Sequence, residues 1–104
     1  MDIDNDEPRY VISIAARMLG VQVHTLRYYE RVGIIEPSRS KGNIRLYSER
    51  DIRLLQRVKT LMEDLGVNLA GVEVVLRMSQ HITELQNQLK ELGEEVKRLK
   101  GVGE

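Results

Sequence analysis

The fold is decided by residues 14–33, which read IAARMLGVQVHTLRYYERVG. A helix-turn-helix requires a small residue where its two helices approach each other, and a glycine at the sharp turn that follows. Ala16 and Gly20 stand four positions apart and meet both requirements. Gly20 suits the turn because glycine readily adopts the left-handed backbone conformation that ends a helix. The stretch therefore predicts one helix over about 14–19 and a second over about 23–32.

The ends and the packing of these two helices are also predicted by the sequence. Ser13 offers a hydroxyl N-cap to the first helix, and Gly33 stops the second. Apolar side chains at matching positions should hold the two helices together: Leu19, Val21, Leu26 and Tyr29.

Residues 34–47 predict a hairpin with a basic tip, which would form a wing beside the helix-turn-helix. Residues 34–37 are expected to be extended, since Pro37 disfavours helix just before it. The segment SRSKGN at 38–43 has turn composition, and IRLY at 44–47 alternates like a short strand.

A third and a fourth helix follow the hairpin. Ser48 and Asp51 are spaced as a capping box at the start of the third helix, with Asp in place of the usual Glu. This helix should run to about Leu65, with Gly66 as its C-cap. Asn68 is expected to cap the fourth helix.

The fourth helix carries a heptad pattern that predicts a coiled coil. A helix with so narrow an apolar stripe is marginal alone, so it requires a partner helix. It could pack back on its own domain, but the chain is too short to supply a helix of equal length, which favours dimerisation. The apolar positions, spaced alternately by three and four residues, are Val75, Met78, Ile82, Leu85, Leu89, Leu92, Val96 and Leu99.

The domain organisation expected from these elements is simple. Residues 1–8 are polar and acidic and are expected to form a disordered tail. Residues 9–78 would form a winged helix-turn-helix domain that opens with a short strand at 10–12, residues 79–100 a dimerisation helix, and residues 101–104 a flexible end. The fold class is mainly α, a winged helix-turn-helix with a small β-hairpin followed by a long helix.

Composition excludes several classes of protein. The chain of 104 residues has no Cys, so disulfides, thiolate metal sites and iron–sulfur clusters are excluded. No apolar run approaches the roughly 20 residues that a membrane span needs, and the acidic N-terminus is unlike a signal peptide. We therefore expect a cytoplasmic protein with no membrane contact, no cofactor and no bound metal.

Charge is segregated along the chain although the formal net charge is zero. Residues 1–8 carry a balance of −4, and residues 61–104 a balance of −3. Residues 9–60 carry eleven Arg or Lys against four acidic side chains, a balance of +7. A basic block of this kind is the footprint of a surface that faces nucleic acid, although a solvated basic face is also common.

Other classes of function are weaker readings of the same sequence. An enzyme is disfavoured because His24 and His81 lie on different helices, and no glycine-rich phosphate loop or paired carboxylate motif is present. A protein-binding adaptor built on a winged helix is the rival from another class. Charge discriminates the two readings, since an adaptor has no need of the basic block at 9–60.

The second helix of the motif should read bases with its N-terminal part. His24 and Thr25 are therefore the candidates for direct readout, with Gln22 and Tyr28 on the same side of the helix. Each has a plainer alternative. His24 could be a solvated surface residue, and Tyr29 a core residue with its hydroxyl near the surface. Three further residues could be ordinary surface charges or local ion pairs: Arg27 (beside Glu30), Arg39 and Lys41.

The run TLRYYERVGII at 25–35 resembles the signature of MerR-type regulators. The resemblance continues in register through a set of positions in the hairpin, namely Pro37, Arg39, Asn43, Arg45 and Tyr47. It covers about residues 10–78. Within the family, LGVNLAGVE at 65–73 and YVISIAA at 10–16 are most similar to the HspR heat-shock repressor subgroup.

The resemblance implies particular roles for residues of this chain. Arg27, Tyr28 and Tyr29 would lie at the DNA backbone, with wing arginines beside them, and Lys59 would reach a phosphate. A Tyr29 with a buried ring and a phosphate-bound hydroxyl would satisfy both readings of that residue. The full set of predicted DNA contacts is Arg17, Gln22, His24, Thr25, Arg27, Tyr28, Tyr29, Arg39, Lys41, Asn43, Arg45 and Lys59. The resemblance also implies an antiparallel coiled coil through Ile82, Leu85, Leu89, Leu92, Val96 and Leu99.

The function implied is a repressor of heat-shock or chaperone genes that binds an inverted-repeat operator in double-stranded DNA as a homodimer, with a DnaK-type chaperone as co-repressor. The alternative within the family is a nitrogen-metabolism repressor. Two departures from the family pattern matter. Gln22 stands where the family has Ser or Thr, so the recognition helix is expected to start without a good cap. The sequence also offers neither sensor cysteines nor a large C-terminal domain, so any signal is expected to come from elsewhere.

Overall fold

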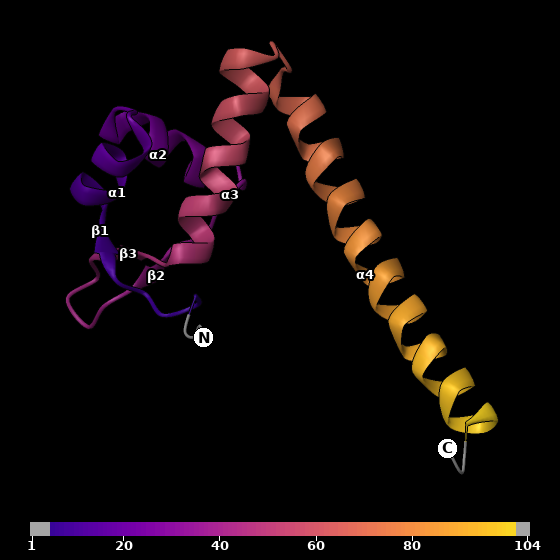
Figure 1. Ribbon diagram of the computed structural model, residues 1–104. Coiled ribbons are helices and arrows are strands. Elements are labelled where there is room, and N and C mark those ends of the chain that lie inside the picture. Colours follow the sequence, from indigo (N-terminus) through magenta and orange to yellow (C-terminus); the bar gives the residue numbers. More distant parts are fainter. Residues whose placement is uncertain (1–4, 102–104) are drawn as a thin grey trace. The chain divides into compact units, whose positions relative to one another are not determined.

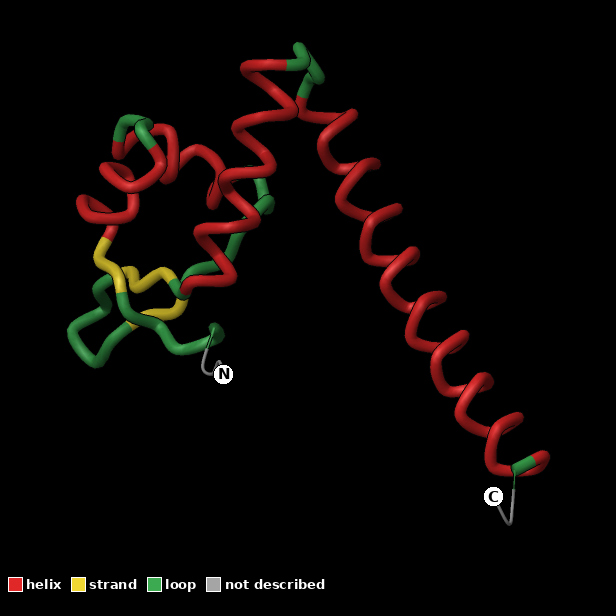
Figure 2. The backbone as a smooth tube through the Cα atoms, viewed as in Figure 1, coloured by secondary structure: helices red, strands yellow, loops and turns green. Residues whose placement is uncertain are grey.

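The computed structural model of this chain describes residues 5–101 (Figure 1). The chain divides into two compact units, one ending at Asn68 and the other beginning at Leu69. The first unit contains a helix-turn-helix, a small sheet and a third helix, and the second is a single long helix (Figure 2). The predicted fold class, mainly α with a winged helix-turn-helix and a long C-terminal helix, is confirmed.

The first unit alternates short strands with helices. Helix α1 packs against both α2 and α3, and β3 lies against β1, β2 and α3. The elements, in chain order, are β1 (Tyr10–Val11), α1 (Ile12–Leu19), α2 (Val23–Arg31), β2 (Ser38–Arg39), β3 (Arg45–Tyr47), α3 (Glu49–Lys59) and a π-helical turn η1 (Thr60–Asp64).

The turn of the helix-turn-helix forms at Gly20, as predicted. Gly20 has a φ of 71°, and its N–H donates to the Arg17 carbonyl at 3.2 Å. The next amide, Val21, donates to the Ala16 carbonyl at 3.0 Å. These bonds satisfy carbonyl groups that the end of α1 would otherwise leave without a partner.

The start of α1 differs from the prediction. The helix begins at Ile12, so Ser13 lies inside its first turn and does not cap it. Val11 occupies the N-cap position with an extended backbone and no side-chain cap bond. The reason is the sheet: Val11 pairs with Leu46 of β3, and this pairing holds the chain extended up to the residue where the helix begins.

Helix α2 starts at Val23 without a side-chain cap, as the sequence predicts. Gln22 stands at its N-cap with an extended backbone, and its side chain makes no capping bond. The helix ends at Arg31, one residue earlier than predicted, and Gly33 follows with a φ of 89°.

The wing is a hairpin whose turn is shorter than predicted. Ser38–Arg39 forms strand β2, although its composition predicted a turn, and it pairs antiparallel with β3. The turn is closed by Ser40, whose N–H donates to the Ile44 carbonyl at 2.9 Å and whose hydroxyl accepts from the Ile44 N–H at 3.2 Å. Strand β3 begins at Arg45, one residue later than predicted. Strand β1 joins the other edge of β3, which gives a three-stranded sheet in the order β1-β3-β2.

Helix α3 opens with the predicted capping box. The Asp51 N–H donates to the Ser48 hydroxyl at 3.0 Å, and the Ser48 N–H donates to the Asp51 carboxylate at 2.9 Å. The α-helix ends at Lys59 and continues as η1, in which the Leu65 N–H donates to the Thr60 carbonyl. The sequence predicted an unbroken helix to Leu65 and did not reveal this π turn.

The core of the first unit confirms most of the predicted packing. Leu19, Leu26 and Tyr29 are buried, whereas Val21 is half-buried. The buried apolar side chains of this unit are Ala15, Ala16, Leu19, Leu26, Tyr29, Ile35, Tyr47, Leu55 and Val58.

The segment before β1 makes defined contacts, which differs from the disordered tail expected over residues 1–8. The Asn5 carbonyl accepts a hydrogen bond from the Arg50 N–H at 3.0 Å, and the Asp6 carboxylate pairs with the Arg50 guanidinium at 2.9 Å. The ion pair is exposed and accompanies the backbone hydrogen bond, so it adds little to the stability of this contact. Residues 1–4 and 102–104 of the predicted tail and flexible end lie outside the described residues.

Helix α4 (Leu69–Lys100) forms the second unit. Its 32 residues run without a break, a length of about 48 Å at the usual rise per residue. The helix passes continuously through residues 78 and 79, and the domain boundary placed there stays a prediction. Among residues 5–101, no helix combines the length and the apolar character needed to cross a membrane.

Candidate DNA interface

Helix α2 presents one face to solvent and buries the other. Leu26 and Tyr29 are 0% and 5% exposed and hold the inner face in the core. The residues predicted to contact DNA from this helix lie on its outer face and around the start of the helix. Gln22, His24, Arg27 and Tyr28 are exposed, and Thr25 is half-buried.

Tyr28 sits in a small group of rings and charge on this outer face. Its ring centroid lies 6.0 Å from that of Tyr29, and the Arg31 guanidinium lies 5.4 Å from the Tyr28 centroid. Such a cation–π contact holds an arginine against an aromatic face. Arg31 was not among the predicted contacts, although its place three residues after Tyr28 was a signal for this pairing.

Tyr29 has a buried ring and a hydroxyl directed at a partner within the unit. Its hydroxyl donates to the Met62 sulfur at 3.8 Å, so η1 supplies the acceptor. Burial raises the pKa of Tyr29 above its ordinary value, which keeps the hydroxyl protonated as a donor. The ring of Tyr29 is therefore a core residue, as the plainer alternative predicted. The contact of its hydroxyl with DNA stays a prediction.

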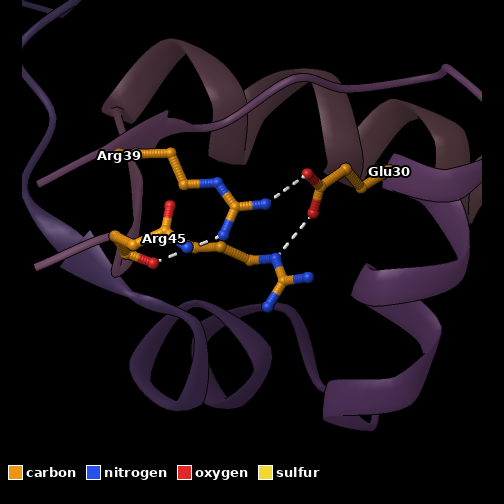
Figure 3. A network of polar contacts seen from close by, with 4 residues as sticks. Glu30, Arg39 and Arg45 are labelled. Carbon is orange, nitrogen blue, oxygen red and sulfur yellow. Dashed lines mark hydrogen bonds and ion pairs between the residues drawn. The ribbon is translucent and has the colours of Figure 1, made fainter.

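The two wing arginines meet one carboxylate of α2, that of Glu30 (Figure 3). Arg39 donates from Nη2 to one oxygen of Glu30 at 2.7 Å, and Arg45 donates from Nε to the other oxygen at 2.6 Å. Arg39 also reaches the Asn43 carbonyl at 3.5 Å. The hydrogen bonds from Arg45 and Arg39 lower the pKa of Glu30, so it stays ionised at neutral pH.

Glu30 was not recognised from the sequence as a link to the wing. It was considered only as an intrahelical partner of Arg27, whereas the structure pairs it with Arg39 and Arg45. A signal was present, because Glu30 is the only acidic residue between Arg9 and Ile35. A lone carboxylate in a basic block is a candidate to form ion pairs with several arginines at once.

Lys59, the last residue of α3, reaches the turn of the helix-turn-helix. Its Nζ donates to the Leu19 carbonyl at 2.9 Å, at the end of α1. A half-buried ammonium group with three donors can hold this carbonyl and retain donors for another acceptor. The predicted phosphate contact of Lys59 remains a prediction beside this observed structural bond.

The remaining predicted contacts are exposed and lie apart in sequence. Arg17 is in the last turn of α1, and Lys41 is at the turn of the wing. Asn43 is also in that turn, with a φ of 65° that Asn tolerates better than most residues. The structure thus links the wing arginines directly to α2 and carries Lys41 and Asn43 on the same hairpin.

The site offers hydrogen-bond donors and positive charge. Among residues 5–101, no cluster of three or more His, Cys, Asp or Glu could hold a metal ion. The exposed groups of α2 and the wing are hydrogen-bond donors, a histidine and arginines, which suit an anionic and polar partner surface.

Comparison with known proteins identifies this arrangement. Residues 10–79 match the family described as MerR HTH family regulatory protein. This chain belongs to the MerR family. The matched residues include the helix-turn-helix, the wing and α3, so the family resemblance drawn from the TLRYYERVGII run is confirmed.

Relatives within the MerR family include two proteins that bear on its finer assignment. HspR of Streptomyces coelicolor, named as a heat shock protein, is 43% identical over 91 residues, covering 88% of this chain and 60% of the relative. The transcriptional regulator GlnR of Bacillus anthracis is 38% identical over 77 residues, covering 74% of this chain and 59% of the relative. The chain thus spans about 60% of the length of the HspR relative and 59% of GlnR.

A solved structure shares the fold at lower identity. HiNmlR, a MerR family regulator lacking the sensor domain, bound to promoter DNA, is 20% identical. It aligns with a TM-score of 0.63 over 89% of this chain and 76% of its own.

Proposed function

We propose that this chain is a sequence-specific DNA-binding transcription regulator that docks α2 in the major groove and the wing beside it. The observation that carries the proposal is the joining of the exposed α2 face to two wing arginines through Glu30. These groups lie in the segment with a charge balance of +7, which suits a phosphate backbone. Membership of a regulatory family supports the same reading.

The proposed regulator acts as a homodimer through α4. The stripe residues Ile82, Leu89 and Leu99 are 51%, 69% and 73% exposed within one chain. A continuous helix with apolar residues at heptad spacing requires a second helix to cover them. A two-fold dimer would present two identical recognition helices and therefore bind an inverted repeat.

Selection of bound sequences from random DNA tests this function. We expect an inverted repeat whose half-sites lie one or two helical turns apart, roughly 34 Å per turn. Enrichment of no sequence, together with binding that is insensitive to salt, would reject DNA recognition. That result would favour the protein-binding adaptor instead.

We further propose that the regulated genes are heat-shock or chaperone genes and that the protein represses them. The 43% identity to the HspR relative supports this assignment. A DnaK-type chaperone is the proposed co-repressor, and it would act by favouring the folded dimer that binds DNA. A repressor of such genes would work in the cytoplasm, at the nucleoid.

A gel-shift titration on the selected sequence tests the regulatory proposal. Added chaperone should tighten binding, and added unfolded protein should reverse the gain by competing for the chaperone. Equal binding with and without chaperone would contradict the co-repressor role. The 38% identity to GlnR makes a nitrogen-metabolism regulator the second candidate, with a metabolic enzyme as its protein partner.

A further inference from the structure

We infer that Glu30 is a positioning residue for DNA binding: its carboxylate fixes the wing arginines against the recognition helix and aims the terminal nitrogens of Arg45 at a DNA phosphate. This inference rests on the proposed function. It assigns a binding role to an acidic residue, which would otherwise be expected to repel DNA.

The hydrogen-bond geometry divides the donors of Arg45 between two tasks. Its Nε donates to Glu30 at 2.6 Å. Within the described residues, the structure gives its two terminal nitrogens no partner, and Figure 3 shows them pointing away from the carboxylate. An arginine presents its donors in a rigid planar fork, so holding Nε on Glu30 fixes the direction of the remaining pair. That pair has the spacing that phosphate oxygens accept.

The same carboxylate also joins two elements that are separate in the chain. Its second oxygen accepts from Arg39 at 2.7 Å, and Arg39 and Arg45 lie opposite each other on β2 and β3. Glu30 stands near the end of α2, so one side chain ties both strands of the wing to the recognition helix. The Glu30, Arg39 and Arg45 side chains are 23%, 37% and 25% exposed, which leaves the cluster accessible to a partner.

Because of the charges of the cluster, the direction in which DNA affinity changes can test the inference. Two guanidinium groups and one carboxylate leave a net charge of +1. By simple electrostatics, neutralising Glu30 would add a positive charge and strengthen binding to phosphate. If Glu30 positions the arginines, neutralising it frees two long side chains whose ordering then opposes binding, and affinity falls. The two accounts predict opposite changes.

The experiment compares E30Q with a matched control, E36Q, on DNA selected by the wild-type full-length chain. Glu36 is an exposed glutamate in the same basic block and makes no ion pair with the described residues. We expect E30Q to weaken binding about tenfold for a dimer that uses the contact twice. E36Q should leave binding unchanged or slightly tighter.

Salt dependence supplies a readout that a general loss of stability would not change. If Arg45 leaves its phosphate in both subunits of E30Q, the slope of log K against log salt should become shallower by about two. In an Arg45→Ala background, E30Q should weaken binding less than it does in the wild type, because one of the two arginines that Glu30 positions is already gone. E36Q should leave the slope of log K against log salt unchanged. It should also cause no loss of affinity in the R45A variant.

Three results bear on the inference separately. Binding by E30Q that equals or exceeds wild type, with an unchanged slope, overturns it. If E30Q folds poorly by circular dichroism, E30D replaces it, since a shortened carboxylate cannot hold both arginines; wild-type binding by E30D also overturns it. Absence of DNA binding by the wild-type chain would instead reject the proposed function.

Discussion

Lys59 of α3 donates a hydrogen bond from Nζ to the carbonyl oxygen of Leu19, the last residue of α1, at 2.9 Å. A cation at this place complements the partial negative charge at the C-terminal end of a helix. A Cβ atom at Gly20 would lie 3.2 Å from the same Nζ, and Gly20 has a φ of 71°. Lys59 therefore anchors the turn of the helix-turn-helix to α3.

Lys59→Met is expected to lower the free energy of unfolding by about 1–2 kcal/mol, because the apolar stem is kept while a charged donor to a part-buried carbonyl is lost. Urea unfolding of the full chain measures this change. Lys41→Met is the control, since Lys41 is exposed at the wing turn and its loss should leave stability unchanged. Wild-type stability in Lys59→Met would assign Lys59 to phosphate contact alone.

Stability should respond to acid through Glu30. Hydrogen bonds from Arg45 and Arg39 hold the pKa of Glu30 below its ordinary value of 4.5 in the folded state. A depressed carboxyl pKa stabilises the fold above the unfolded pKa, and this contribution is lost as pH falls through the folded pKa. The difference in unfolding free energy between wild type and Glu30→Gln should thus be full at neutral pH and should vanish below the folded pKa.

Denaturant unfolding at a series of pH values from neutral to about pH 2 measures that difference. Glu36→Gln is the control, and its difference from wild type should show no comparable fall. A Glu30→Gln difference that stays constant down to the lowest pH would show that the pairing with Arg45 and Arg39 is not coupled to ionisation.

The local elements of the first unit were predictable because single residues dictate them. Gly20 and the Ser48–Asp51 capping box act over three or four positions, and both form as predicted. The start of α1 was wrong because strand pairing of Val11 with β3 outweighs the capping preference of Ser13. Likewise, β2 forms in a segment of turn composition because β3 supplies the hydrogen bonds.

The links between elements were less predictable from the sequence. The bond from Lys59 to Leu19 joins residues 40 positions apart, and the pair of Arg45 with Glu30 spans 15. Charge composition predicted that a basic surface exists, but it does not specify which arginine a carboxylate meets. Periodicity also did not reveal η1, since a π turn lengthens the hydrogen-bond spacing by one residue without a distinct composition.

Mutations should distinguish the residues that read DNA bases from those that contact the DNA backbone. His24→Ala and Thr25→Ala are expected to relax base preference within the half-site, because each removes a side chain near the N-terminus of α2. Tyr28→Phe and Arg45→Ala should weaken all sequences alike, since a phosphate contact carries no sequence information. Titrations on the selected site and on sites with single base changes give both quantities.

The salt dependence of the wild-type protein checks the same assignment. If each subunit meets roughly four phosphates, the slope of log K against log salt should be about −7. A nearly flat dependence would contradict the role given to the basic block at residues 9–60. His24→Ala should leave the slope unchanged, whereas Arg45→Ala should make it shallower.

Leu89→Asp is expected to convert the protein to a monomer. Leu89 is 69% exposed within one chain and lies at the middle of the apolar stripe, so a charge there would be buried in the dimer seam. Sedimentation at several protein concentrations measures the assembly state. Asn87→Asp adds the same charge on α4 outside the stripe and should remain dimeric. A dimer in Leu89→Asp would place the interface elsewhere.

Gly93→Ala is expected to stabilise the dimer. Gly93 lies inside α4, where glycine is less favourable than alanine by about 1 kcal/mol, and within the chain a Cβ there would meet no atom within 4 Å. It directly follows the stripe residue Leu92, at the border of the seam. In a knobs-into-holes seam a methyl group is accommodated at such a border position, so the gain in helix propensity should appear in both subunits. Thermal unfolding at two protein concentrations should therefore show a higher Tm for Gly93→Ala at each. A lower Tm would mean that the partner helix approaches the Gly93 backbone too closely for a methyl group, which contradicts an ordinary heptad seam at this position.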